Sequence, residues 1–233
     1  MDEKEYLHMF EEEERHWWYA GMRAIVLALL PPRAISVRPR VLDAGCGTGY
    51  NMGWFRQHYG AAVTGIDFYP HGLGYCRRRG ERDLVRADAA ALPFSGDTFH
   101  LVASFDVLSH LKDGHARAAA LGEFFRVLKP GGRLMVSDIV LLQELPEEIR
   151  NSIGAYLGCV AGAVTKSDYI QAIQAAGFQG IKVIEEVTFP TELLANDPTA
   201  REIVKNLNLP REKAQELARS VVSMKVSAVK PAA

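Results

Sequence analysis

The sequence has few cysteines, no long apolar run and no excess of either charge. Cys46, Cys76 and Cys159 are far apart and odd in number, which argues against a disulfide framework and favours a reducing, cytoplasmic compartment. The 27 Lys+Arg residues nearly balance the 28 Asp+Glu residues, so bulk positive charge does not hold the protein on nucleic acid. No C-x-x-C or H-x-x-x-H pattern occurs, and no metal site is predicted.

The sequence also lacks a segment that would place it in a membrane. The acidic first residues exclude an ordinary signal peptide, and the apolar run at residues 24–30 is too short to span a bilayer. A length of 233 residues fits one domain over residues 1–233. Within it we expect a helical cap at 1–32, a ligand-binding core at 33–140, and a substrate-side part with the last two strands at 141–233.

Strand and helix patterns alternate along the chain. Strands are predicted at 41–42, 62–66, 84–87, 99–105, 133–140, 181–189 and 224–229. Helices are predicted at 3–30 with a break at Gly21, and at 51–59, 72–79, 116–128, 146–157, 199–206 and 211–221, besides one capped by Ser167. This alternation predicts an α/β fold: a doubly wound, mostly parallel, seven-stranded Rossmann-like sheet with helices on both faces and an N-terminal helical cap.

The most informative stretch runs from Val41 to Gly49 and reads V-L-D-A-G-C-G-T-G. A buried strand enters closely spaced glycines that open a helix, so a ligand can lie against the backbone and meet the positive end of the helix dipole. Asp67 ends the next strand, where a carboxylate can accept hydrogen bonds from a ribose diol.

The glycine spacing differs from a dinucleotide fingerprint, and no Gly-Lys-Ser/Thr follows, so the loop is not a P-loop. It resembles motif I of the class I S-adenosylmethionine-dependent methyltransferases. Three further stretches, at 87–94, 99–110 and 125–134, resemble later motifs of that family in the same order. Any one of these pieces is common in other proteins; the ordered set over residues 40–140 carries the resemblance.

The resemblance implies S-adenosylmethionine as cofactor and S-adenosylhomocysteine as product. Gly45, Cys46 and Gly47 would meet its methionine part, Asp67 would hold the ribose, and Phe105 would lie near the sulfonium. The implied cofactor-binding residues are Asp43, Gly45, Cys46, Gly47, Asp67, Phe68, Asp88, Ala89, Leu92 and Phe105. For Asp88, capping of the following turn is the alternative to an adenine contact.

Methyl transfer from a sulfonium is a direct displacement, in which alignment of the acceptor supplies much of the rate. An oxygen or nitrogen acceptor can also need a base. Asp106 and His110, after the fourth strand, are the catalytic candidates, although a structural role for His110 is an equal alternative. The expected partner is a small-molecule acceptor, with no nucleic acid or membrane, and the protein is a monomer or homodimer.

Four aromatic or imidazole side chains, His16, Trp17, Trp18 and Tyr19, precede the glycine loop. They resemble an H-W-W element found in many small-molecule methyltransferases, and we predict that they bind substrate. Aromatic faces also suit a sulfonium. Packing of a cap helix is the alternative for each Trp.

The C-terminal half resembles arsenite methyltransferases, and Cys159 matches one of their arsenic-binding cysteines. Their other cysteines are replaced, by Met52 after the glycine loop and by Asp106 after the fourth strand. Arsenite methylation is therefore an alternative function, with plain burial the alternative for Cys159. A module that binds a cofactor or metalloid without chemistry is a third hypothesis.

Overall fold

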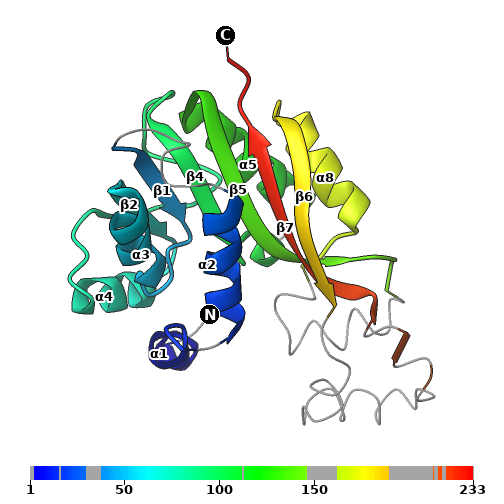
Figure 1. Cartoon of the computed structure of the whole chain (residues 1–233), viewed down its shortest axis with the longest axis horizontal. Coiled ribbons are helices and arrows are strands. Elements are labelled where there is room, and N and C mark those ends of the chain that lie inside the picture. The colour runs from blue at the N-terminus through cyan, green and yellow to red at the C-terminus, as the bar shows by residue number, and fades with distance from the viewer. Residues whose placement is uncertain are drawn as a thin grey trace.

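A computed structural model describes residues 3–15, 17–29, 38–111, 113–145, 162–188, 212, 215–216 and 219–232. Its centre is a seven-stranded sheet in the order β3-β2-β1-β4-β5-β7-β6 (Figure 1). The strands are β1 (Arg40–Ala44), β2 (Ala62–Asp67), β3 (Leu84–Arg86), β4 (Phe99–Phe105), β5 (Leu128–Leu141), β6 (Gln179–Thr188) and β7 (Val221–Val229). The first five pair in parallel, and β7 runs antiparallel between β5 and β6. The predicted fold is confirmed.

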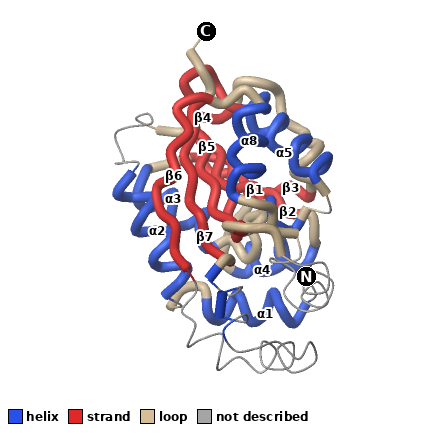
Figure 2. Tube along the Cα trace, turned by 90° about the vertical axis from the view of Figure 1, so that its right-hand side faces the viewer, coloured by secondary structure: helices blue, strands red, loops and turns tan. Residues whose placement is uncertain are grey.

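Helices cover both faces of this sheet. They are α1 (Glu3–Glu12), α2 (Trp17–Leu29), α3 (Tyr50–Tyr59), α4 (Pro70–Arg78), α5 (Gly114–Val127) and α8 (Lys166–Ala175), with a 3-10 turn, η1, at Leu108–His110. Figure 2 shows α2 and α3 on one face and α5 and α8 on the other. In both views α1 lies apart from the faces, beyond the ends toward which the parallel strands run.

Two apolar clusters fill the layers between helices and sheet. On one face, Leu121 and Phe124 of α5 pack with Tyr169 of α8 against the strands. On the other, Met52 and Phe55 of α3 pack against β1 and β2. Parallel strands buried on both faces are continuous apolar runs, and this explains why they were predictable from sequence. The helices thereby fix the carboxyl ends of β1, β2 and β4, where the candidate site lies.

The structure departs from the sequence prediction at three places. The N-terminal helix breaks between α1 and α2, around residues 13–16, and not at Gly21. Thr165 caps α8 by accepting from the Asp168 N–H, so the cap predicted at Ser167 is wrong. The strand predicted at 133–140 begins earlier, at Leu128, and contains a bulge, because pairing with β4 moves from Leu128 directly to Arg133. The helices predicted at 146–157 and 199–206 lie outside the described residues, as do residues 211, 213–214 and 217–218 of the helix predicted at 211–221.

Candidate active site

The loop between β1 and α3 is held in a conformation that needs glycine. Gly45, Gly47 and Gly49 have φ values of 84°, 54° and 87°, in the left-handed region that disfavours a side chain. A Cβ added at Gly45 would lie 2.3 Å from a methyl group of Val107, so the loop also lies directly against the segment after β4. The loop is a tight cradle between the ends of two neighbouring strands.

The N–H groups of this loop are used within the protein. Those of Gly45 and Cys46 both donate to the Ile66 carbonyl, at 2.9 and 2.8 Å. The Gly47 N–H donates to Asp67 Oδ2 at 3.0 Å. Since a backbone amide donates once, these three residues would meet a ligand through their Cα atoms and carbonyl groups.

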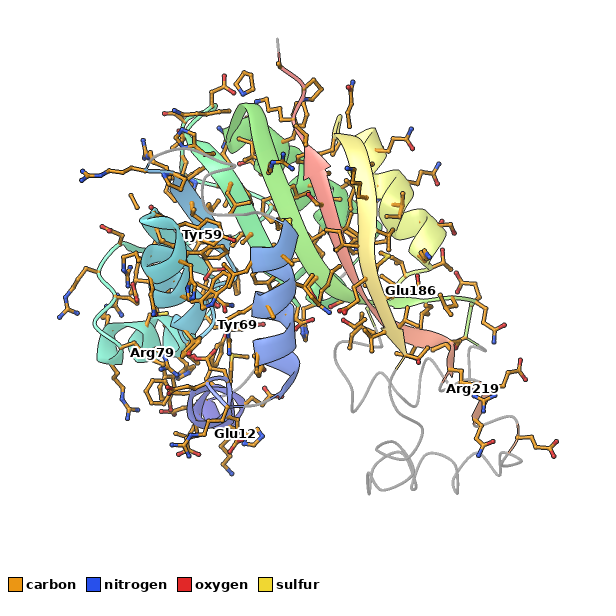
Figure 3. All side chains as sticks on the ribbon, in the orientation of Figure 1. Glu12, Tyr59, Tyr69, Arg79, Glu186 and Arg219 are labelled. Carbon is orange, nitrogen blue, oxygen red and sulfur yellow. The ribbon has the colours of Figure 1, made fainter. Side chains whose placement is uncertain are left out.

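Asp67, at the end of β2, binds the cradle through its side chain. Its Oδ1 accepts from the Tyr69 N–H at 2.9 Å and from the Tyr6 hydroxyl of α1 at 3.0 Å. Figure 3 labels Tyr69 beside the helices that surround this end of the sheet. Burial raises the pKa of Asp67, and these hydrogen bonds act in the opposite direction. The sequence placed this carboxylate one strand away from the glycine loop, and the structure joins the two directly through Gly47.

Asp43, at the carboxyl end of β1, lies beneath the cradle and is 1% exposed. Its Oδ2 has no hydrogen-bond partner among the described residues. Burial raises its pKa to about 8. A buried carboxylate oxygen without a donor is costly, and it suits a cationic or N–H-bearing ligand group.

Beyond Asp67, the predicted adenine side presents both exposed and buried groups. Phe68 is 54% exposed, whereas Ala89 and Leu92 are buried. Asp88 Oδ1 accepts from the Ala90 N–H at 2.9 Å, so the turn-capping alternative for Asp88 is observed. Its contact with adenine stays a prediction, as does the stacking of a base on Phe68.

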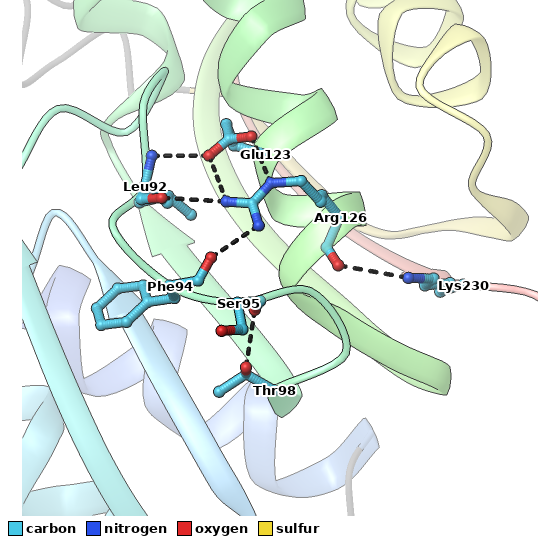
Figure 4. A network of polar contacts seen from close by, with 7 residues as sticks. All are labelled: Leu92, Phe94, Ser95, Thr98, Glu123, Arg126 and Lys230. Carbon is cyan, nitrogen blue, oxygen red and sulfur yellow. Dashed lines mark hydrogen bonds and ion pairs between the residues drawn. The ribbon is translucent and has the colours of Figure 1, made fainter.

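A clamp on α5 fixes the loop that contains Leu92 (Figure 4). Glu123 accepts from the Leu92 N–H at 2.7 Å and pairs with the Arg126 guanidinium. Arg126 in turn donates to the carbonyls of Leu92 and Phe94, at 3.0 and 2.7 Å. The planar guanidinium supplies several donors in one fixed fork, so this pair sets the path of the loop.

On the predicted acceptor side, Phe105 and Asp106 are half-buried at the end of β4, and His110 ends η1. Asp106 has a φ of 56°, an uncommon conformation that Asp tolerates better than most residues. Atoms around the His110 imidazole desolvate it and lower its pKa, while Glu5 of α1 acts in the opposite direction. Both catalytic candidates therefore lie on the same edge of the sheet as the cradle.

A fully buried carboxylate on β5 holds the segment between these two candidates. Asp138 accepts from the Ser109 N–H at 3.0 Å and from the Tyr169 hydroxyl at 2.7 Å. Arg117 adds a hydrogen bond to the Leu108 carbonyl at 3.2 Å. Sequence reasoning missed this fastening, because Asp138 is 29 residues from Ser109 and 31 from Tyr169.

Comparison with known proteins agrees with this geometry. Residues 42–136 match the family described as a methyltransferase domain. The match covers less than half of the chain, and over this part the chain resembles the class I S-adenosylmethionine-dependent methyltransferases. The match contains the cradle, Asp67, the clamped loop and the end of β4.

Curated proteins to which this chain is similar are named as methyltransferases. The methyltransferase GfsG of Streptomyces halstedii is 29% identical over 170 residues, covering 67% of this chain and 59% of that protein. An arsenite methyltransferase of Halobacterium salinarum is 27% identical over 158 residues, covering 64% of this chain and 40% of that protein. The chain thus spans less than two thirds of the length of these relatives.

Solved structures show the same fold. Phosphoethanolamine N-methyltransferase 2 of Haemonchus contortus has a TM-score of 0.67 and 21% identity, covering 91% of this chain and 53% of that chain. The cyclase SpnF has a TM-score of 0.66 and 19% identity, covering 94% and 84%. At these identities the likeness concerns the fold, and a cyclase among the neighbours separates the fold from methyl transfer.

The residues at this site fit S-adenosylmethionine, the cofactor that the resemblance implies. The left-handed Gly45 and Gly47 bring no side chain of their own into the cradle, and Asp67 is oriented by the N–H groups of Gly47 and Tyr69. Asp43 Oδ2, which has no hydrogen-bond partner among the described residues, suits the ammonium group of a methionine moiety. No group of three or more His, Cys, Asp and Glu side chains able to hold a metal ion occurs among the described residues. In the same described part of the chain, no helix is both long and apolar enough to cross a membrane.

Two thiols lie under the cradle. The Sγ atoms of Cys46 and Cys76 are 3.7 Å apart, and Cys76 Sγ donates to the Gly47 carbonyl at 3.3 Å. The hydrogen bond with Cys76, together with burial, raises the pKa of the Cys46 thiol. Cys76 therefore supports the loop, and Cys46 is not poised as a thiolate.

Four of the five predicted substrate-binding side chains lie outside the described residues. The side chains of His16, Trp17 and Trp18, and the whole of Cys159, lie outside the described residues. Tyr19 is half-buried near the start of α2. The roles of all five in binding substrate stay predictions.

The sequence analysis did not identify α1 as part of the candidate site. Besides Tyr6 on Asp67, the Met9 Sδ lies 3.0 Å from where a Gly47 Cβ would stand. Glu13, just after α1, is 5% exposed and pairs with Arg79 at 2.9 Å. Glu13 lies in a run of acidic residues whose other members are exposed. Its burial, which distinguishes it from them, can be read only from the structure.

Proposed function

We propose that this chain transfers a methyl group from S-adenosylmethionine to a small-molecule acceptor. The observation that carries the proposal is the hydrogen bond between Gly47 N–H and the Asp67 carboxylate, which ties the glycine cradle to a ribose-binding acid across two strands. Asp67 would hold the ribose, Asp43 would face the methionine moiety, and the Leu92 loop would flank the adenine. The bound cofactor supplies an electrophilic methyl group on a sulfonium.

The chain's own contribution to the chemistry is alignment and, for an acceptor with a proton to lose, a base. Asp106 and His110 are the residues on the cradle's edge that can accept such a proton. A lowered pKa keeps the His110 imidazole neutral near pH 7, the form that can accept. The Asp138 hydrogen bond to Ser109 holds the backbone next to His110, so the base would be positioned from the core.

Two measurements test this function. Calorimetric titration with S-adenosylhomocysteine should show one binding site, and Asp67→Asn should weaken binding at least tenfold because a charge-assisted partner is lost. Asp97→Asn is the matched control: it removes an exposed carboxylate that pairs with Lys230 before β4, at the opposite edge of the sheet. Absence of binding by the folded wild-type protein would overturn the proposal.

The acceptor itself requires a turnover experiment. Transfer of a radiolabelled methyl group should be measured on a panel containing phenols, amines, carboxylates, thiols and arsenite. Label transferred only to arsenite, and lost in Cys159→Ser, would favour the arsenite alternative. Binding of S-adenosylhomocysteine without turnover on any acceptor would favour the non-catalytic alternative.

A further inference from the structure

The Asp67 carboxylate is nearly saturated by hydrogen-bond donors of the protein. A carboxylate offers about four lone-pair positions, two on each oxygen. Oδ1 uses both, for the Tyr6 hydroxyl and the Tyr69 N–H, and Oδ2 uses one, for the Gly47 N–H. One position remains, whereas a ribose diol brings two hydroxyl donors. One protein donor must therefore leave before Asp67 can hold the diol through both hydroxyls.

Of the three donors, the Tyr6 hydroxyl is the one that can leave without dismantling the cradle. Gly47 and Tyr69 donate from the backbone of the cradle and of the segment after β2. Tyr6 belongs to α1, which lies outside the two helical layers (Figure 2). Its ring packs against Gly72, where an added Cβ would lie 2.8 Å away, and is 2% exposed. The Tyr6 side chain therefore occupies space next to Asp67, the carboxylate that would hold the ribose.

Met9 fills the neighbouring position over the glycine loop. Its Sδ would be 3.0 Å from a Cβ at Gly47, the closest approach to that site within 4 Å. Gly47 is a residue that the proposed function assigns to the methionine part of the cofactor. Tyr6 and Met9 are three positions apart, so they lie on one face of α1. That face covers both cofactor contacts together.

The opposite end of α1 has much stronger attachments. Glu13 accepts a hydrogen bond from Arg79 at 2.9 Å and another from the Thr48 hydroxyl. Its carbonyl accepts from Arg23 at 3.0 Å. Arg79 also donates to the Phe10 carbonyl at 2.9 Å and lies over the Phe10 ring. The C-terminal end of α1 is thus a fixed point about which the Tyr6 end can swing.

We propose that Tyr6 is an affinity-determining residue, whose hydroxyl holds the place of a ribose hydroxyl on Asp67 until the cofactor displaces it. The inference rests on the proposed function, because it takes Asp67 as the ribose ligand. Helix α1 and the cofactor compete for one site, so the apparent affinity is reduced by the fraction of molecules in which α1 is seated. Removing the hydroxyl should raise that affinity.

The test compares S-adenosylhomocysteine binding by variants of the full chain in calorimetry. Tyr6→Phe should bind roughly tenfold more tightly, since it loses a hydrogen bond to a charged group in the seated state alone. Tyr59→Phe is the matched control, because it removes a buried hydroxyl that donates to the Val26 carbonyl, on the face of the sheet covered by α2 and α3. Met9→Ala, a second route to the same release, should also tighten binding.

Hydrogen exchange of the wild-type protein gives an independent readout. Saturating S-adenosylhomocysteine should speed exchange of the amides in residues 3–12, because α1 leaves its seat. Slower exchange there, or weaker binding by Tyr6→Phe, would overturn the inference and make Tyr6 a cofactor contact. Wild-type binding with Tyr6→Phe unchanged would also sink the inference while leaving the proposed function intact. No binding by the wild type and by either variant would sink the proposed function itself.

Discussion

Two buried carboxylates, Asp67 and Asp138, have closely similar surroundings and opposite roles. Each stands near the carboxyl end of a parallel strand, and each accepts a backbone N–H and a tyrosine hydroxyl. The tyrosine on Asp138 comes from α8, whose apolar face is part of the core, whereas the tyrosine on Asp67 comes from the outlying α1. Asp67 also accepts a second backbone N–H, from Tyr69. The same pairing of a backbone N–H with a tyrosine hydroxyl therefore makes a permanent fastening in one place and an exchangeable one in the other.

The largest expected effect follows from removing the permanent fastening. Asp138→Ala should lower the free energy of unfolding by about 3–4 kcal/mol, because the Ser109 N–H and the Tyr169 hydroxyl would be left buried without an acceptor. Asp67→Ala should cost about 1–2 kcal/mol, since exposed Tyr69 and half-buried Gly47 can turn to water. Urea unfolding of both variants measures the difference. Equal losses of unfolding free energy in the two variants would show that the two carboxylates do not differ in their contribution to the fold.

The second test uses pH. Burial raises the pKa of Asp138 to about 6, so the folded state binds its proton more tightly than the unfolded state does. Its contribution to stability is therefore greatest below the unfolded pKa and is lost as pH rises from about 4 to about 6, by on the order of 2–3 kcal/mol.

Asp138→Asn should remove this contribution to the pH dependence of stability. The amide oxygen can still accept from Ser109, and the amide N–H₂ can donate to the Tyr169 oxygen. The stability of the variant relative to wild type, measured by urea unfolding between pH 4 and 7, should rise with pH. A flat difference would show that Asp138 does not titrate in this range.

The third test removes the tyrosine hydroxyl that donates to each carboxylate. Tyr169→Phe should cost about 2 kcal/mol of unfolding free energy, because a fully buried carboxylate oxygen loses its donor. Tyr6→Phe should cost less, about 1.4 kcal/mol, which is the equivalent of the tenfold gain in affinity, because Oδ1 of Asp67 keeps the Tyr69 N–H. Thermal unfolding under one buffer ranks the two. A larger loss for Tyr6→Phe would mean that α1 is a structural part of the fold.

The smallest effect concerns a third carboxylate, the partly exposed Glu123 of the Leu92 clamp. Arg126→Lys should weaken S-adenosylhomocysteine binding by a few fold, since an ammonium cannot reproduce the forked donation to the Leu92 and Phe94 carbonyls. Unfolding free energy should change by less than about 1 kcal/mol. Arg133→Lys, on β5, serves as the control. Unchanged binding would mean that the clamp does not set the loop.

The sequence was sufficient for what depends on local patterns. Apolar runs predicted the strands, and glycine spacing with a carboxylate one strand later predicted the cradle and Asp67. Contacts between distant segments were not predictable: Tyr6 and Asp67 are 61 residues apart, and neither a helical tyrosine nor a strand-end acid indicates the other. The Ser167 prediction failed because both Thr165 and Ser167 can cap a helix, and the sequence does not show at which of them the helix begins.

The place of β7 has a consequence for synthesis of the chain. β6 joins the sheet only through β7, which pairs with β5 on its other side. Residues 189–220 and then β7 itself must therefore be synthesised after β6 before β6 has a partner. The five strands that carry the cradle can assemble earlier, so a nascent chain has its ligand-binding half in place while β6 is still an unpaired segment.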